Sequence, residues 1–198
     1  DKRQRLFDLL ELTSRFYNEL LMNQPVGEKA KEYLRERGVS EETMKSFYIG
    51  YAPKQWDALQ SFLRARSFSP SEMQAAGVVG EGRTGKLYDR FRGRIIFPVN
   101  DLQGRVVAFG GRIVPWCETG EEGKYINSPE TELYEKRRVV YNLERAKSSL
   151  RGSNCIVVEG YMDVIMMDQV GVKNVVASSG TAFTEEQVER IGRFTKEL

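Results

Sequence analysis

Histidine is absent from this sequence of 198 residues, and cysteine occurs only twice. Without histidine the chain cannot build a Ser-His-Asp triad, a histidine–metal site or a Cys/His zinc finger from its own residues. Cys117 and Cys155 are far apart in the sequence, and Cys155 begins a predicted buried strand. We therefore expect two reduced thiols in a cytosolic protein. The sequence also has no apolar run of membrane-spanning length and no signal-peptide pattern.

A large excess of one charge is missing as well, because 30 Lys and Arg against 28 Asp and Glu leave a net charge of +2. This balance does not by itself indicate a nucleic-acid partner, although a basic face can be balanced by acidic residues elsewhere. Hydrophobic residues make up 40% of the chain and charged residues 29%. These proportions predict a folded chain with a substantial core, in one domain or in two small ones.

The first third of the sequence predicts a mainly helical part. Apolar residues between Leu6 and Met22 recur at helical spacing. Further helices are predicted over 28–37, from Ser40 onward, over 56–66 and over 70–77, with a strand over 47–51. Ser69-Pro70-Ser71-Glu72 supplies an N-cap, a proline at the first helical position and a glutamate at the third.

The middle of the sequence predicts strands. Residues 94–99 and 105–109 form two strong strand patterns, and residues 100–104 between them have the composition of a hairpin turn. A loop or turn is expected over 80–85 and an extended piece over 124–131. A further strand over 138–141 and a helix over 143–150 lead the chain into its last part.

Three basic and aromatic sets in this middle part suggest nucleic-acid contacts. Arg90, Arg92 and Arg94 alternate, so an extended chain places all three guanidinium groups on one face, where they could bind phosphates. Gly110-Gly111 beside Arg112 could let a phosphate approach the backbone. The third set combines positive charge, a stacking ring and an amide, as in proteins that bind single-stranded nucleic acid: Lys124, Tyr125, Asn127 and Lys136. Each set also has an interpretation without a ligand. The alternating arginines could belong to a solvated edge strand, the glycine pair to an ordinary turn, and the third set to a surface hairpin.

Residues 154–190 predict a strand–helix–strand–helix unit. The apolar run from Cys155 to Val158 predicts a buried strand, and residues 161–170 have helical spacing. A second apolar run over 175–177 leads to Ser178-Ser179-Gly180-Thr181, and residues 184–187 form a capping box for a closing helix. Short connections make this a parallel βαβα unit, in which ligands bind at the carboxyl ends of the strands.

Glu159 stands at such a strand end, and Asp163 follows in the first turn of the predicted helix. Two carboxylates in this position suit a hard cation such as Mg²⁺. The alternative is that Asp163 only complements the helix dipole and that Glu159 is a solvated strand end.

Two motifs of this unit resemble a known domain. Glu159-Gly160-Tyr161-Met162-Asp163-Val164 and Ala177-Ser178-Ser179-Gly180-Thr181-Ala182 are similar to the first two motifs of a Toprim domain. Toprim domains occur in primases, topoisomerases, nucleases and recombination proteins, all of which act on nucleic-acid phosphodiesters. Residues 89–98, 104–112 and 124–131 then resemble the ordered blocks of the bacterial DnaG-type primase catalytic core, blocks that topoisomerases lack. Residues 47–56 are similar to that family too, so the resemblance covers nearly the whole chain.

The resemblance implies an α/β fold in two parts. A mixed α/β amino-terminal subdomain with a basic template-binding face is expected over 1–150, and the first part of a Toprim subdomain with parallel strands over 151–198. It also implies a DNA-directed RNA polymerase, a nucleotidyltransferase that makes short RNA primers from ribonucleoside triphosphates on single-stranded DNA during replication. Mg²⁺ or Mn²⁺ would serve a two-metal mechanism.

The same resemblance assigns roles to individual residues. Glu159 matches the metal-linked glutamate of the family, and Asp163 its acidic partner. Positions tied to activity or to template and nucleotide binding are matched by five residues: Arg37, Arg112, Lys124, Tyr125 and Lys136. The three alternating arginines and Asn127 are added on their own chemistry.

The sequence departs from the family at both ends. No counterpart of the zinc-binding or helicase-binding domains is present, and no Asp-x-Asp motif follows Glu159. We expect the remaining metal ligands beyond Leu198 of a longer parent protein, zinc only in a domain that this chain lacks, and little or no polymerase activity from this chain alone. Weak binding to single-stranded DNA is still expected.

The expected partners are a single-stranded DNA template, an RNA primer and ribonucleoside triphosphates. Replicative helicase and single-strand-binding protein would be contacted through the parent protein, in the bacterial cytoplasm at the nucleoid-associated replisome and away from membranes. Two alternatives stay open at this point. One is a piece of another Toprim enzyme, and the other is a non-catalytic nucleic-acid-binding module whose carboxylates are only structural.

Overall fold

A computed structural model describes the whole chain, residues 1–198, and its central element is a four-stranded antiparallel sheet. The strand order is β1 (Gly50–Ala52), β4 (Arg94–Asn100), β5 (Val106–Ile113) and β6 (Tyr125–Asn127). Strands β4 and β5 are buried along nearly their whole length. Their continuous apolar runs therefore match a sheet that is covered on both faces.

The hairpin between β4 and β5 forms where the sequence predicts it. The Asp101 carboxylate accepts hydrogen bonds from the backbone N–H groups of Gln103 and Arg105, and Gly104 adopts a φ of +80°. An aspartate that bonds to the backbone two residues ahead, followed by a glycine with positive φ, closes the turn without steric cost.

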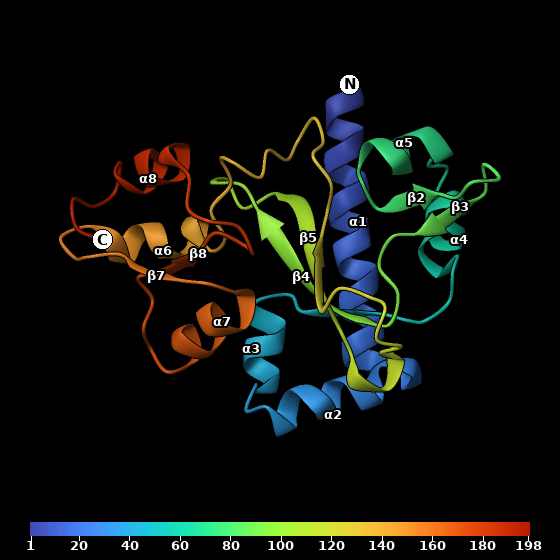
Figure 1. Ribbon diagram of the computed structural model, residues 1–198, viewed down its shortest axis with the longest axis horizontal. Coiled ribbons are helices and arrows are strands. Elements are labelled where there is room, and N and C mark those ends of the chain that lie inside the picture. Colours follow the sequence, from blue (N-terminus) through green and yellow to red (C-terminus); the bar gives the residue numbers. More distant parts are fainter.

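Helix α1 (Lys2–Asn23) crosses the central sheet and packs on β1 and β5 (Figure 1). Its buried stripe includes Leu6, Leu9, Leu10, Tyr17 and Leu21, in the helical period of the sequence. The other elements of this part are η1 (Pro25–Gly27), α2 (Glu28–Glu36), α3 (Glu41–Ser46), α4 (Ala58–Arg64), α5 (Pro70–Ala75), β2 (Val79–Glu81), β3 (Leu87–Asp89) and η2 (Pro115–Cys117). The capping box predicted for α5 is present, because Ser69 and Glu72 exchange side-chain and backbone hydrogen bonds.

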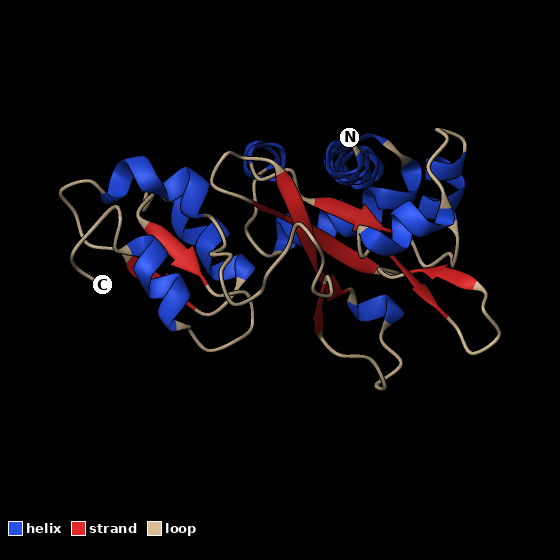
Figure 2. Cartoon of the chain, turned by 90° about the horizontal axis from the view of Figure 1, so that it is seen from above, coloured by secondary structure: helices blue, strands red, loops and turns tan.

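The last part of the chain is the predicted parallel unit. Helix α6 (Leu143–Leu150) leads to β7 (Ile156–Val158), α7 (Tyr161–Gln169), β8 (Val175–Ala177) and α8 (Glu185–Ile191), and β7 pairs with β8 in parallel. Thr184 and Gln187 cap α8 as predicted. Figures 1 and 2 show these elements gathered on one side of the central sheet, with α4, α5 and the β2–β3 ribbon on the other. The α/β fold with a parallel βαβα unit is thus confirmed.

The two ends of the fold share one apolar core. The largest buried cluster joins Leu34 and Phe97 from the first part to Tyr161, Val164 and Val175 from the second. Phe97 and Tyr161 stack in parallel with ring centroids 5.1 Å apart. The βαβα unit is therefore held against the central sheet by apolar packing and not by a flexible linker.

Two local expectations are wrong. Residues 138–141 do not form a strand, since only Tyr141 makes an isolated bridge to Ala177. The first strand of the βαβα unit is not buried, because β7 has β8 as its single strand partner and Val157 is 40% exposed. An apolar run shows that a strand can pack on both faces, while the helices that cover those faces decide whether it does.

Candidate nucleic-acid and metal site

Six of the residues singled out in the sequence line one cleft of about 360 Å³. It lies where the end of β5 and the start of α7 meet β6 and the end of α2. These six residues are Arg37, Arg112, Tyr125, Asn127, Glu159 and Asp163. The fold therefore brings the predicted carboxylates and part of the predicted basic and aromatic set to the same place.

The carboxylates occupy the carboxyl end of β7. Glu159 follows the strand directly and is exposed, and Asp163 is exposed in the first turn of α7. One oxygen of Asp163 accepts a hydrogen bond of 3.2 Å from the backbone N–H of Gly160. This contact fixes the Asp163 carboxylate beside Glu159 and leaves its remaining oxygen lone pairs free.

The oxygen atoms of these two carboxylates are suitable ligands for a hard divalent cation, but two carboxylates do not make a complete ligand set. Mg²⁺ takes oxygen ligands and commonly keeps several waters, with one or two carboxylates from the protein. No group of three or more His, Cys, Asp or Glu side chains capable of holding a metal gathers in the chain. A cation held by Glu159 and Asp163 would therefore need its other ligands from water or from the phosphates of a nucleotide.

The opposite wall of the cleft is basic and aromatic. Arg112 and Tyr125 are direct partners in the β5–β6 pair, and a guanidinium N–H of Arg112 donates to the Tyr125 hydroxyl over 3.3 Å. Arg37, just after α2, lies over the ring of Tyr33 at 5.6 Å from its centroid. Both guanidinium groups form no ion pair within the chain, so they remain available to an anionic ligand.

Asn127 joins the two parts of the fold across the floor of the cleft. Its side-chain Nδ2 donates to the backbone carbonyl of Ser179 over 3.0 Å, and its Oδ1 accepts from the Tyr161 hydroxyl over 2.6 Å. Burial holds the pKa of Tyr161 above its ordinary value, so this hydroxyl stays protonated and donates. The amide predicted to contact nucleic acid is thus also a structural bridge between β6 and the loop after β8.

The role of Tyr161 is not evident from sequence periodicity. Its ring is buried between Phe97 and Tyr141, where the first residue of a helix would be expected at the surface. The signal that could have found it is Gly110, because a Cβ there would lie 2.3 Å from the Tyr161 ring. A glycine inside a strand often marks such a close approach.

The interpretation of Gly110-Gly111 as an opening for phosphate is wrong. Both residues lie inside β5 and are buried, and neither stands in a turn. The ring of Tyr161 covers Gly110, and the ring of Phe91 approaches the Cβ position of Gly111 to 2.8 Å. The two glycines make room for aromatic rings, and only Arg112 beside them reaches the cleft.

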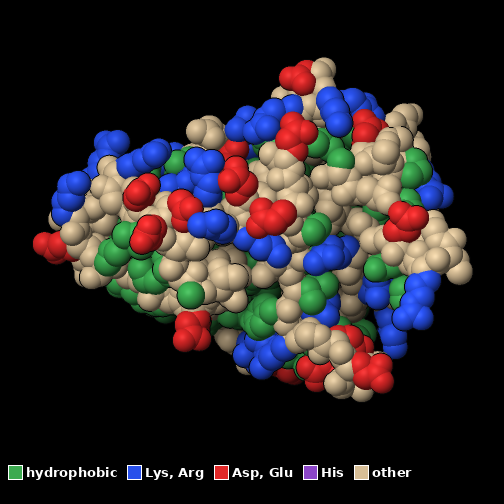
Figure 3. Space-filling view, turned by 45° about the horizontal axis from the view of Figure 1, so that its top comes forward, with side chains coloured by type: hydrophobic (Ala, Val, Ile, Leu, Met, Phe, Trp, Pro, Cys, Tyr) green, Lys and Arg blue, Asp and Glu red, His purple; other side chains and the backbone are tan.

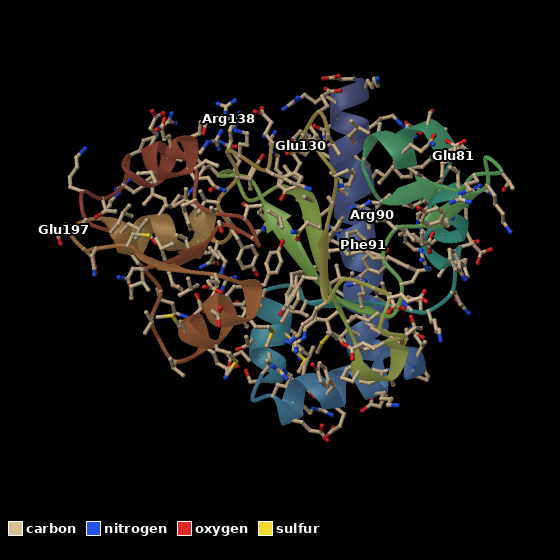
Figure 4. The ribbon with its side chains drawn as sticks, viewed as in Figure 1. Glu81, Arg90, Phe91, Glu130, Arg138 and Glu197 are labelled. Carbon is tan, nitrogen blue, oxygen red and sulfur yellow. The ribbon has the colours of Figure 1, made fainter.

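The expected row of three arginines on one strand face is also wrong. Only Arg94 belongs to a strand, and it is buried, with N–H groups that donate to the carbonyls of Gly111 and Gly123. Arg90 donates twice to the carbonyl of Asn127, over 3.0 and 2.6 Å, and Arg92 stacks on Trp56 at 3.8 Å. Between them, Phe91 is buried in the apolar cluster that includes Leu6 and Tyr17 of α1, whereas Arg90 stays partly exposed (both are labelled in Figure 4).

The alternation in the sequence misleads here because residues 90–93 lie between β3 and β4 and belong to neither strand. Gly93 adopts a φ of +60°, which turns the chain before β4 begins. The arginines consequently meet backbone carbonyls in three different places. Arg90 still contributes to the cleft indirectly, because its hydrogen bonds to the Asn127 carbonyl hold the end of β6 in place.

The two predicted lysines do not line the cleft. Lys124 precedes β6 and is exposed, and Lys136 is partly exposed in the segment that leads to α6. On the face drawn in Figure 3, lysines and arginines alternate with carboxylates, so this face does not show the continuous basic surface expected for a template. The positive charge near the carboxylates is concentrated in Arg37 and Arg112.

Comparisons with known proteins agree with this geometry. Residues 16–147 match the family model described as "DNA primase catalytic core, N-terminal domain", and residues 153–198 match the Toprim domain. A DNA primase of Synechococcus elongatus is 42% identical over 98% of this chain, and one of Enterococcus faecalis is 40% identical over 100% of it. The chain spans 28% and 32% of the length of these two relatives.

Solved structures have the same fold. The RNA polymerase domain of the Mycobacterium tuberculosis primase DnaG matches with a TM-score of 0.89 and 37% identity, over 97% of this chain and 62% of that one. A DnaG primase catalytic domain bound to single-stranded DNA matches with a TM-score of 0.87 and 38% identity, over 99% of this chain and 62% of that one. The Toprim and primase matches together imply a use of divalent metal in general. No helix in the structure has the length and apolar character needed to cross a membrane.

Proposed function

This chain belongs to the family of bacterial DnaG-type DNA primases, and from that premise we propose that its cleft forms part of a site for primer synthesis. The reaction would join ribonucleoside triphosphates into short RNA primers on a single-stranded DNA template. The observation that carries this proposal is the meeting of Glu159 and Asp163 with Arg37 and Arg112 in one cleft. We also infer that the two subdomains divide near residue 150, between α6 and β7.

Mg²⁺ is the metal that we propose for the carboxylates, with Mn²⁺ as its substitute. Glu159 and Asp163 would hold it, and the bound cation would supply charge neutralisation for the oxygens of a nucleotide. Asp163 is already oriented by the N–H of Gly160, so its position would change little when the cation binds. Glu159 has no hydrogen bond to orient it, and we expect its side chain to be ordered by the metal.

The basic wall would bind the nucleic acid and the incoming nucleotide. Arg37 and Arg112 present guanidinium groups that can each hold a phosphate through two parallel hydrogen bonds. Tyr125 is 38% exposed and offers a ring for a base to stack on. The relative whose structure contains single-stranded DNA supports a DNA template for this chain too. Helicase and single-strand-binding protein would be contacted by the longer protein in the bacterial replisome.

Binding to a fluorescein-labelled single-stranded oligonucleotide, followed by anisotropy, tests the basic wall. We expect Arg112→Ala to weaken binding by about three- to tenfold and to reduce the slope of log affinity against log salt. Arg83→Ala is the matched control, because Arg83 is exposed between β2 and β3 and lies outside the cleft. Equal effects of the two substitutions would show that the cleft does not bind the DNA.

Primer synthesis by a full-length primase into which this sequence is placed tests the carboxylates. We expect Glu159→Gln to abolish synthesis while the fold and the DNA affinity survive, since the change removes charge but keeps shape. Glu189→Gln, on the exposed side of α8, is the control and should be without effect. If Glu159→Gln left synthesis intact, the carboxylates would be structural and the module interpretation would replace ours.

A further inference from the structure

The last turn of α7 contacts the segment of chain between α2 and α3. Gln169 is the final residue of α7, and it uses both ends of its side-chain amide there. Its Nε2 donates to the backbone carbonyl of Gly38 over 2.8 Å, and its Oε1 accepts from the backbone N–H of Ser40 over 2.9 Å. These partners are 131 and 129 residues away in the sequence, although α7 and α3 lie side by side in Figure 1. One side chain therefore bridges the βαβα unit and the first part of the fold.

The backbone groups that Gln169 contacts follow directly after Arg37. Gly38 ends α2 with a φ of +86°, and the backbone N–H of Val39 donates to the carbonyl of Leu34 over 3.0 Å. This closure of the helix end fixes the backbone of residues 37–39 relative to α2. A contact that holds Gly38 therefore also holds the backbone of Arg37, which belongs to the basic wall of the cleft.

The opposite end of α7 carries the carboxylates. Asp163 lies in the first turn of the helix, and Glu159 stands just before it. With a rise of 1.5 Å per residue, Asp163 and Gln169 are about 9 Å apart along the helix axis. Because a short helix moves as one body, a shift at Gln169 also moves the carboxylates. The amide of Gln169 thus joins the helix that carries the carboxylates to the segment that carries Arg37.

Apolar packing alone does not fix this arrangement. Val164 of α7 and Val39 are buried in the same cluster, but the hydrophobic effect has no direction and allows packed surfaces to slide. Hydrogen bonds depend on distance and angle, so an amide that uses its donor and its acceptor together sets one position. Gly38 and Ser40 are exposed, and water can therefore pair with their backbone groups if the amide is removed. The two hydrogen bonds consequently contribute more to geometry than to stability.

Helix α3, next to this segment, is held at its other end as well. Arg145 of α6 donates to the carbonyl of Ser46 over 2.8 Å and to its hydroxyl over 2.9 Å. The same guanidinium group lies 3.9 Å from the centroid of the Phe47 ring, and its Nη2 is 3.7 Å from the carboxylate of Asp168, the neighbour of Gln169. Helix α3 is thus attached at both ends to the last part of the chain, and it forms a fixed base for the contact with Gln169.

We propose, on the basis of the function proposed above for the cleft, that Gln169 is a positioning residue. By binding Gly38 and Ser40, it holds the start of α7 close to Arg37, so that the carboxylates and this guanidinium group face the same ligand. Gln169 is not among the residues that line the cleft. It therefore acts only through the residues that do.

Cross-linking between the two walls of the cleft measures this spacing without DNA or metal. Arg37→Cys and Glu159→Cys place one thiol on each wall for a short bismaleimide, and the two native thiols are buried. In this background we expect Gln169→Met to lower the rate of cross-linking about two- to tenfold, since a lost hydrogen bond shifts an equilibrium between two positions by about this factor. Methionine keeps the length of the side chain but lacks the amide.

Gln74→Met is the matched control for cross-linking. Gln74 lies on α5, and its amide donates to Glu81 over 2.9 Å, away from the cleft. This variant should leave the rate unchanged. Gln169→Glu is a second test that keeps the size of the side chain, because its carboxylate loses the donor for Gly38 and should also slow cross-linking. An unchanged or faster rate in both variants of Gln169 would overturn the proposal.

Binding of the labelled oligonucleotide tests the consequence for the proposed function. We expect Gln169→Met to weaken binding about two- to fivefold in the parent chain and to have no further effect in Arg37→Ala, because the two residues act on one contact. A purely structural role would give the same loss in both backgrounds. Such additive losses, or a loss for Arg37→Ala alone, would overturn the positioning role and leave the basic wall as proposed. No loss for Arg37→Ala would refute DNA binding by Arg37, and the cross-linking rate would then decide the role of Gln169 by itself.

Discussion

Tyr161 and Tyr17 allow one chemical change to be compared in two opposite settings. Both rings are buried, at 2% and 1% exposure. The Tyr161 hydroxyl donates to Asn127 over 2.6 Å, whereas the Tyr17 hydroxyl has no partner at all. Replacing either residue by phenylalanine removes a single oxygen and keeps the ring. The difference between the two variants therefore isolates the hydrogen bond from the packing.

The magnitudes follow from this contrast. Tyr161→Phe loses a buried hydrogen bond and leaves the Asn127 oxygen without its donor, which should cost about 1–2 kcal/mol of unfolding free energy. The stack on Phe97 at 5.1 Å stays in place, so no cavity term is added. Tyr17→Phe removes a buried hydroxyl that pairs with nothing, and we expect it to be neutral or to stabilise the fold by up to about 1 kcal/mol.

Urea unfolding followed by circular dichroism measures both variants. We expect the midpoint of Tyr161→Phe to fall and that of Tyr17→Phe to stay or rise, with the slope against urea unchanged. In thermal unfolding, Tyr161→Phe should lower Tm by roughly 2–8 °C for a chain of this size. Equal shifts for both variants, or a stabilised Tyr161→Phe, would refute the bridge between Tyr161 and Asn127.

Three further predictions concern other parts of the fold. Gly110→Ala should destabilise the fold by about 2 kcal/mol or more, measured by urea unfolding, because the new Cβ would overlap the Tyr161 ring at 2.3 Å. Burial raises the pKa of Glu144 from 4.5 to about 7. The folded state therefore favours the protonated form of Glu144, and the parent chain loses unfolding free energy as the pH rises from about 4.5 to 7. Glutamine does not titrate, so the unfolding free energy of Glu144→Gln should rise by up to about 3 kcal/mol relative to that of the parent chain between pH 5 and pH 8. Arg94→Lys should lower Tm by several degrees, since a lysine cannot satisfy the three carbonyls that the buried guanidinium contacts.

The Glu144 prediction is checked by unfolding titrations of both proteins across that pH range. An unchanged difference between them would contradict the raised pKa. For Arg94, the exposed Arg83→Lys serves as the control and should leave Tm where it is. A similar Tm for both lysine variants would show that the buried contacts of Arg94 contribute nothing.

The helices and the two long strands could be predicted because their signals are local. Helix α6 begins and ends at the residues expected, and the caps of α5 and α8 involve side chains only three positions apart. Helical period, turn composition and capping depend on neighbours within one or two turns, and the tertiary structure does not overrule them here. The carboxylates were placed for the same reason, since a strand followed by a helix fixes where Glu159 and Asp163 must lie.

Sequence alone therefore determined most of the elements, the family resemblance and the position of the carboxylates. The tertiary structure decided which other side chains meet them. Arg37, Arg112 and Asn127 line the cleft, while the guanidinium group of Arg94 donates to backbone carbonyls and Lys124 is not among the lining residues. Such outcomes depend on contacts between residues that are distant in the chain, such as Gly110 with Tyr161, and a pattern of residue types does not encode which distant surfaces pack together.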